Sequence, residues 1–337
     1  MKLNFRYSLE NFRGVAIIFV MLSHIGSFKS MGQYSDYLFY FLVDATAWFV
    51  FISGYLFYYL EIEKFNYTKY LARKLKFVIL PYLILSVPAI AAGLYLSRNI
   101  LMDLTASDYA IWSILTGGTV VAPMWFIPMI AVFFLLTPLL SRIAKSPLLL
   151  AVTVTGLLFS IFSFRPVHNS NAIFSFLHFA GFYLLGISAA KHALQLDAIS
   201  DAWKVRIIVL SLLAFVLIGF SYPGMEAEPI SFLGTIGGLN YPILGKLALL
   251  VAIFFAFERF FNVQNKSLSF MAKISFGLFF IHGFATLVFV KWLNGLAYPG
   301  DFSRLGAEVF FVVGGSIVVV YVLRRVLGKW SRYVIGC

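Results

Sequence analysis

Arg13 and His24 are the two residues of this chain whose types and spacing most directly suggest chemistry. Both lie in the apolar run FRGVAIIFVMLSHIGSF, which has the length of a membrane helix. Eleven residues turn an α-helix about three times and advance it by about 16 Å, which predicts both side chains on one helix face. An ionisable group at membrane depth is costly and is therefore a candidate functional residue. A histidine there can act as a general base on a hydroxyl near neutral pH.

The elements that must position this pair are membrane helices. Hydrophobic residues make up 61% of the 337 residues and charged residues 12%, against about 25% charged in soluble domains. We predict an all-α integral membrane protein of about ten transmembrane helices around a central polar cavity. The predicted spans are residues 12–29, 37–60, 77–97, 125–141, 148–164, 173–190, 206–222, 239–257, 272–293 and 305–323. Residues 1–337 are expected to form a single transmembrane domain with no appended soluble domain.

The net charge of +12 is explained by membrane topology rather than by nucleic-acid binding. If the N-terminus is cytoplasmic, 20 of the 26 Lys and Arg residues fall in cytoplasmic segments. This positive-inside bias predicts that both termini are cytoplasmic and that the basic surface contacts anionic lipids of the cell inner membrane. The single cysteine, Cys337, excludes an intramolecular disulfide and a cysteine-based metal cluster, and we expect no metal.

Several ionisable residues fall inside the predicted spans, where each is costly unless it is paired. They are His24, Asp44, His178, Lys246, His282 and Glu308. Lys246 requires a counter-ion, for which Asp44 and Glu308 are candidates, and a packing role is the structural alternative for the histidines. Such a set also fits a proton-coupled multi-pass transporter, although the chain has no internal repeat. A non-enzymatic assembly or sensing protein is a third alternative.

Five motifs, in order along the chain, resemble those of the acyltransferase 3 family of integral-membrane O-acyltransferases. Arg13, Gly14 and His24 resemble the family's opening pattern, an Arg-Gly pair followed by a histidine. The other four motifs are F-V-F-I-S-G-Y-L-F at 49–57, R-K-L-K-F-V-I-L-P-Y at 73–82, M-W-F-I at 124–127 and I-S-F-G-L-F-F-I-H at 274–282. Pro81 lies farther from the last basic residue than is usual in the family, and Ala47 occupies a position that is often acidic.

The resemblance implies the transfer of an acyl group, acetyl in our expectation, from cytoplasmic acyl-CoA to a hydroxyl of an extracytoplasmic cell-envelope saccharide. In this interpretation a group of basic residues binds the phosphates of acetyl-CoA, because Lys and Arg are the usual phosphate ligands. This group consists of Arg13, Arg73, Lys74 and Lys76.

For this reaction, the polar and aromatic residues of the predicted spans are candidates for catalysis and saccharide binding. His24 is expected to be the catalytic base, with Arg13 also at the catalytic site and His282 either polarising the thioester carbonyl or steadying His24. The expected saccharide-binding residues are Trp125, Lys246 and Glu308. Trp125 could equally be one of the aromatic residues that commonly lie at the membrane interface without binding a sugar.

Overall fold

The computed structural model describes residues 6–96, 105–117, 121–166, 169–224 and 238–337, and these ranges are built from helices. Lys2 and Arg98, which belong to the predicted charge distribution, lie outside them. The first nine α-helices are α1 (Tyr7–Leu22), α2 (Ser35–Leu42), α3 (Thr46–Glu61), α4 (Tyr67–Lys74), α5 (Leu80–Leu96), α6 (Ala106–Thr116), α7 (Phe126–Leu135), α8 (Thr137–Lys145) and α9 (Leu149–Ile161). The others are α10 (Ala172–Lys191), α11 (Ala193–Asp197), α12 (Asp201–Phe220), α13 (Tyr241–Phe260), α14 (Lys266–Val288), α15 (Asp301–Val309), α16 (Ser316–Leu327) and α17 (Ser331–Val334).

Six of the described helical segments are long and apolar enough to cross a membrane. They are Ser35–Lys64, Tyr67–Tyr95, Ala172–Lys191, Asp201–Phe220, Lys266–Leu293 and Asp301–Val334. Helices α7 and α8 make a seventh if they are one span, which is bent by 59°. Pro138, in the first turn of α8, accounts for the bend because proline has no N–H and disfavours a helical residue before it. The prediction of an all-helical, multi-pass membrane protein is confirmed.

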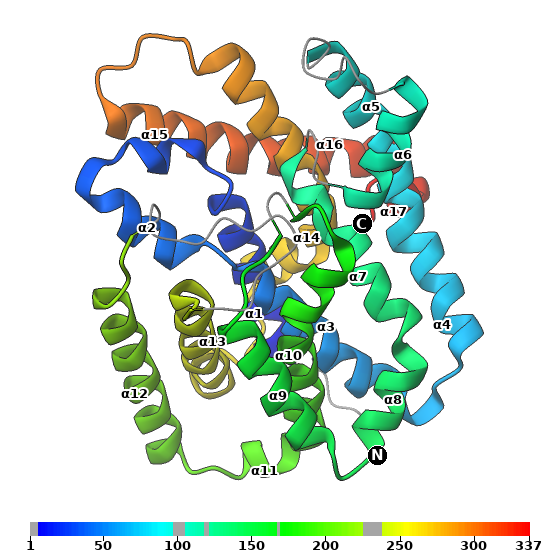
Figure 1. Ribbon diagram of the computed structural model, residues 1–337, viewed down its shortest axis with the longest axis vertical. Coiled ribbons are helices and arrows are strands. Elements are labelled where there is room, and N and C mark those ends of the chain that lie inside the picture. The colour runs from blue at the N-terminus through cyan, green and yellow to red at the C-terminus, as the bar shows by residue number, and fades with distance from the viewer. Residues whose placement is uncertain (1–5, 97–104, 118–120, 167–168, 225–237) are drawn as a thin grey trace.

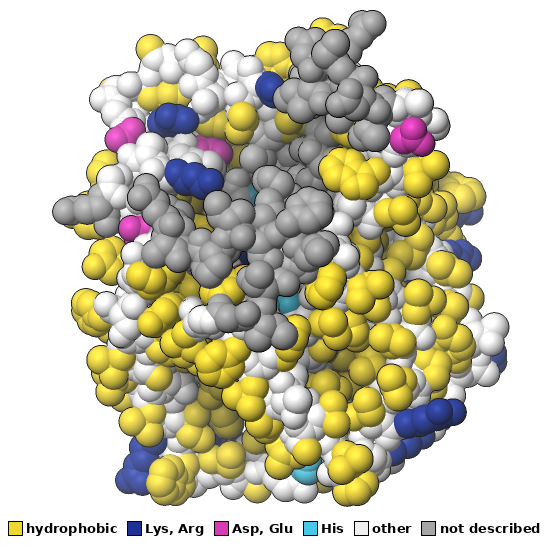
Figure 2. All heavy atoms as spheres, in the orientation of Figure 1, with side chains coloured by type: hydrophobic (Ala, Val, Ile, Leu, Met, Phe, Trp, Pro, Cys, Tyr) yellow, Lys and Arg dark blue, Asp and Glu magenta, His cyan; other side chains and the backbone are white. Residues whose placement is uncertain are grey.

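The helices form a bundle with α3 and α10 packed together at its centre. Helix α9 packs on α10, α1 packs on α14, and α12 packs on α13 at one edge, with α4 and α5 along the opposite edge (Figure 1). Hydrophobic side chains cover broad areas of the surface (Figure 2). On α12, Val209, Leu210 and Leu213 are each more than half exposed, which suits a helix in contact with lipid.

The packing of α3 against α10 requires glycine at two positions. A Cβ atom at Gly54 would overlap the main-chain carbonyl of Tyr183, and one at Gly186 would overlap the carbonyl of Phe51. Because neither residue has a side chain, the two helices approach at the level of their backbones. Gly315 differs, since nothing lies within 4 Å of the place its Cβ would take.

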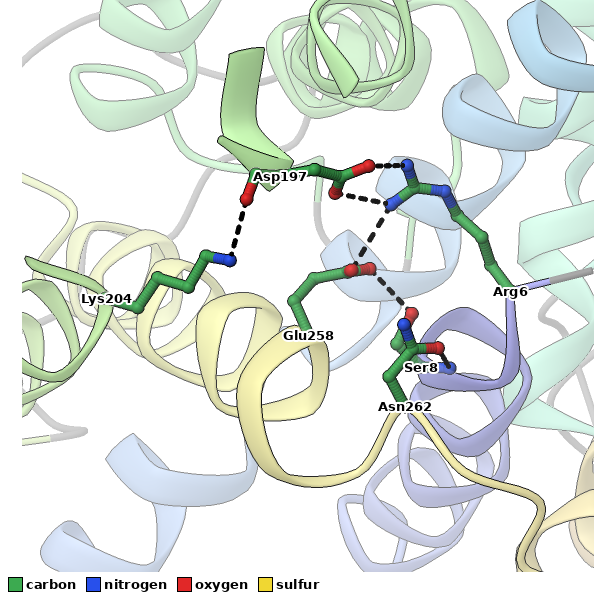
Figure 3. Close-up of polar contacts among 6 residues, drawn as sticks. All are labelled: Arg6, Ser8, Asp197, Lys204, Glu258 and Asn262. Carbon is green, nitrogen blue, oxygen red and sulfur yellow. Dashed lines mark hydrogen bonds and ion pairs between the residues drawn. The ribbon is translucent and has the colours of Figure 1, made fainter. Parts of the chain in front are cut away.

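An ion-pair network fixes the start of α1 to three later helices (Figure 3). Arg6 pairs with Asp197 at 2.5 Å, at the end of α11, and with Glu258 of α13 at 3.2 Å. Glu258 also accepts a hydrogen bond from Ser8 at 2.6 Å, and Lys204 of α12 donates to the Asp197 carbonyl at 3.1 Å. Burial alone would lower the pKa of Arg6, but its hydrogen bond to Asp197 and the nearby carboxylate charges raise it above the ordinary value.

We expect Gly186→Ala to destabilise the protein because the new methyl group overlaps the Phe51 carbonyl. Overpacking of this kind costs about 1–3 kcal/mol. The midpoint of thermal unfolding of the purified protein in detergent should therefore fall. Gly315→Ala is the matched control, and equal midpoints for the two variants would contradict the assigned contact.

Candidate active site

The packing of α1 against α14 brings the N-terminal motif to the later histidine motif. A Cβ atom at Gly14 would lie 2.5 Å from the carbonyl oxygen of Leu268, so only glycine allows this approach. One turn away, Ser269 donates a hydrogen bond to Glu10 at 2.6 Å. Arg13 Nε donates to Ser275 Oγ at 2.9 Å. Arg13 is thereby held by α14, and Gly14 is the residue that permits it.

His24 does not lie on the same helix as Arg13, because α1 ends at Leu22. In a continuing helix the His24 N–H would donate to the Val20 carbonyl; it donates instead to Met21 O at 3.2 Å. The Val20 carbonyl accepts from Ser23 Oγ and His24 Nδ1, both at 2.8 Å. Side-chain competition for one carbonyl thus ends the helix and places His24 in the following turn.

His24 and His282 form an edge-to-face pair. Their ring centroids are 5.1 Å apart with an interplanar angle of 70°. His282 is fully buried on α14, whereas His24 is partly exposed. The two predicted catalytic histidines, separated by most of the sequence, are therefore neighbours in the fold.

The hydrogen bonds of the two rings determine where each carries its proton. His24 Nδ1 lies 2.8 Å from the Val20 carbonyl, and His282 Nδ1 lies 2.8 Å from the Leu278 carbonyl. A carbonyl oxygen only accepts, so each Nδ1 donates and each neutral ring has a lone pair on Nε2. Within the described residues, His282 Nε2 has no hydrogen-bond partner. Both rings are thus arranged to accept a proton at Nε2.

Glu308 holds the segment that follows His24. Its Oε1 accepts from the Gly26 N–H at 2.9 Å and its Oε2 from the Ser27 N–H at 2.8 Å. These residues begin the short 3-10 helix η1 (Gly26–Ser30), whose N-terminal N–H groups favour a negative charge. Glu308 is buried on α15. Both of its carboxylate oxygens accept hydrogen bonds from the backbone that follows His24.

A pocket of about 360 Å³ opens beside this arrangement. Its walls are mostly apolar and come from α3, α7 and α14, and it includes Arg13 and Ser275. Val20 and Phe279 also line it: the Val20 carbonyl binds His24, and the Phe279 ring centroid lies 6.2 Å from that of His282. The histidine pair therefore lies just behind one wall of the pocket.

The other end of the pocket is basic. Arg73 and Lys74 line it, whereas Lys76 does not and lies over the Tyr333 ring at 5.0 Å. Arg73 pairs with Glu61 at 2.6 Å. Lys74 lies over the Phe134 ring at 4.9 Å. Arg332 also lines the pocket and was not among the predicted site residues, although it belongs to the basic C-terminal run.

Trp125 belongs to a separate group of interacting side chains that includes an ion pair. Its ring stacks on Phe179 with centroids 5.9 Å apart, and the Arg165 guanidinium lies 5.5 Å from its centroid. Arg165 pairs with buried Asp44 at 2.8 Å, and its charge acts on the His24 ring. Arg165 was not among the predicted site residues.

Lys246 is held by the backbone rather than by a carboxylate. Its Nζ donates to the Phe41 carbonyl at 2.6 Å and lies 5.3 Å from the centroid of the Trp48 ring. Phe41 is in the last turn of α2, where free carbonyls attract a cation. Of the two candidate counter-ions, Asp44 pairs with Arg165 and Glu308 binds main-chain N–H groups, so neither directly bonds the ammonium.

The fold and the site define a multi-pass membrane protein with two histidines behind a pocket that has a basic end. A family model described as an acyltransferase domain matches residues 6–325, nearly the whole chain. The chain therefore belongs to the acyltransferase 3 family of membrane acyltransferases, as the motifs predicted. No curated protein and no solved structure matches it. In the described part of the chain, no three His, Cys, Asp or Glu side chains are grouped as a metal ion requires.

We expect Glu308→Gln to loosen the turn that carries His24. A carboxamide has one accepting oxygen where the carboxylate has two, so one of the Gly26 and Ser27 N–H groups loses its partner. Hydrogen exchange measured by mass spectrometry should become faster in the peptide that contains these two residues. Glu63→Gln, at an exposed site, is the control, and unchanged exchange in the Glu308 variant would refute the assignment.

Proposed function

We propose that the protein transfers an acyl group, acetyl in the first instance, from cytoplasmic acetyl-CoA to a hydroxyl of a cell-envelope saccharide at the outer side of the inner membrane. One observation carries the proposal: a pocket with a basic end reaches Val20 and Phe279, the residues that contact His24 and His282. A thioester on a long anionic carrier would fit this pocket. Its phosphates require cations, which the basic end supplies, and its reactive carbonyl must lie near a base.

The proposed topology has ten membrane crossings and cytoplasmic termini, with residues 1–337 as one domain. The seven apolar segments would be completed by α1, α9 and α13, of which α9 has only 13 residues. The positive-inside distribution of Lys and Arg supports this orientation. The basic end of the pocket then faces the cytoplasm, where acyl-CoA is available.

The donor is proposed to bind with its phosphates at the basic end and its thioester toward the histidines. Arg73 and Lys74 are at the basic end, and Arg13 lies farther in, held by Ser275. Lys76, which packs on Tyr333, supports this end from outside the pocket. The apolar walls between them suit a pantetheine arm, which has no charge.

The proposed reaction starts at His24 Nε2. This lone pair takes the proton of the acceptor hydroxyl, and the alkoxide oxygen attacks the thioester carbonyl. The carbon–sulfur bond then breaks, and the coenzyme A thiolate leaves and recovers the proton from the His24 imidazolium. With its Nδ1–H donated to the Leu278 carbonyl, neutral His282 has no second N–H to offer, so steadying the imidazolium suits it better than polarising the thioester carbonyl.

The acceptor is proposed to approach His24 from the side of Arg165. This guanidinium is a quarter exposed and bonds Asp44 and the Asn169 side chain, which leaves further N–H groups for sugar hydroxyls. Trp125 is nearly buried and already contacts Phe179 and Arg165, so we propose that it supports Arg165 rather than stacking on a free sugar. Lys246 and Glu308 would shape this side by holding α2 and η1 in place.

We expect the His24→Ala variant to fold and insert into the membrane normally but to transfer acyl groups much more slowly. A general base contributes about 10²–10⁴-fold, and the rate should fall by a factor in that range. The assay uses purified protein in detergent with acetyl-CoA and an extracted envelope glycan, and follows release of the coenzyme A thiol. Because no ion gradient exists in detergent, turnover there also separates an enzyme from a proton-coupled transporter.

The control for that experiment is His192→Ala, since His192 is exposed at the end of α10. Normal turnover by the His24 variant would refute the proposed base. Mass spectrometry of envelope glycans from cells with and without the gene identifies the acceptor and the acyl group together. An unchanged glycan profile would contradict the proposed acceptor class without bearing on the base.

A further inference from the structure

The C-terminal segment, residues 331–337, is built into the wall of the pocket. Ser331 and Ile335 are buried, and Gly336 lines the pocket. Gly336 has φ +79, and a Cβ there would overlap the ring of Phe276, another lining residue of α14. The segment is thus seated closely against the helix that carries Ser275 and His282.

Arg332 projects from this segment at the basic end of the pocket. Its Cζ lies 4.0 Å from the centroid of the Phe77 ring, beyond the end of α4, and the residue is otherwise exposed. A guanidinium stacked on a ring keeps its N–H groups free at the edges. Among the residues that the structure describes, Arg332 has no ion-pair partner.

A ligand with two anionic groups would need cations at two places, and the other cations of the pocket are less available for the second group. Arg13 donates to Ser275, and the charge of Arg73 is offset by Glu61 at 2.6 Å. Lys74 lies against the rings of Tyr70 and Phe134, on the α4 side of the pocket. Arg332 therefore supplies an uncompensated charge from a different element of the chain.

We propose that Arg332 binds the 3′-phosphate of coenzyme A, an assignment that rests on the proposed donor. With the thioester directed toward the histidines, the nucleotide stays at the basic end, where it presents two separate anionic groups. The diphosphate is matched by the α4 cations. The 3′-phosphate is a monoester with three terminal oxygens and about −1.5 to −2 of charge on a single phosphate, which suits the fork of an unpaired arginine.

The test is calorimetric titration of the purified protein in detergent with coenzyme A and with dephospho-coenzyme A, which lacks the 3′-phosphate. Wild type is compared with Arg332→Gln. Arg325→Gln is the matched control, because Arg325 also lies over a ring, that of Tyr321, and hydrogen-bonds its hydroxyl, but does not line the pocket. Both arginines are exposed, so neither substitution should prevent folding.

We expect Arg332→Gln to weaken binding of coenzyme A by about tenfold, the effect of one lost charged hydrogen bond at an exposed site. Binding of dephospho-coenzyme A should change less than twofold, and Arg325→Gln should alter neither. Equal weakening for both compounds, or no change for either, would overturn the assignment to the 3′-phosphate. If wild type bound neither compound, the proposed donor itself would fail, and the assignment with it.

Discussion

The close contact between α1 and α14 is the interaction on which the candidate active site depends. It is made possible by Gly14, whose missing side chain leaves room for the Leu268 carbonyl. Three contacts then follow in parallel order along both segments: Glu10 with Ser269, Arg13 with Ser275, and His24 with His282. A change in the spacing of the two helices would shift all three, so the arginine and the histidines are positioned as a unit.

A second constraint is the cost of polar groups inside an apolar bundle, which the chain meets largely with its own backbone. Lys246 is hydrogen-bonded to the C-terminal end of α2 at Phe41, and Glu308 to the N-terminal end of η1. Such helix-end partners cost no second buried charge, unlike the Asp44–Arg165 pair. These buried ions consequently fix the ends of short helices around His24, which apolar contacts alone hold poorly.

The sequence was sufficient for the helical class and, through its motifs, for the family. Contact between His24 and His282 was only one of the alternatives it left open for His282. It was not sufficient for the end of α1, because hydrophobic periodicity continues through His24 while competition for the Val20 carbonyl is a local matter of side-chain geometry. Nor did it indicate the partners of Lys246 or the place of Arg165. Lys246 and Phe41, and likewise Arg165 and Asp44, are more than a hundred positions apart, and no sequence motif links either pair.

The π-helical turn η4 (Leu75–Ile79), which joins α4 to α5, gives a physical meaning to the unusual distance between the basic run and Pro81. A π turn accommodates one more residue than an α turn without ending the helix. The extra residue changes the rotational phase between the cations on α4 and the membrane-embedded α5 by about 100°. The length of this one turn therefore determines the rotation of α4 relative to α5. It sets which basic side chains face the pocket without changing the orientation of α5 in the lipid.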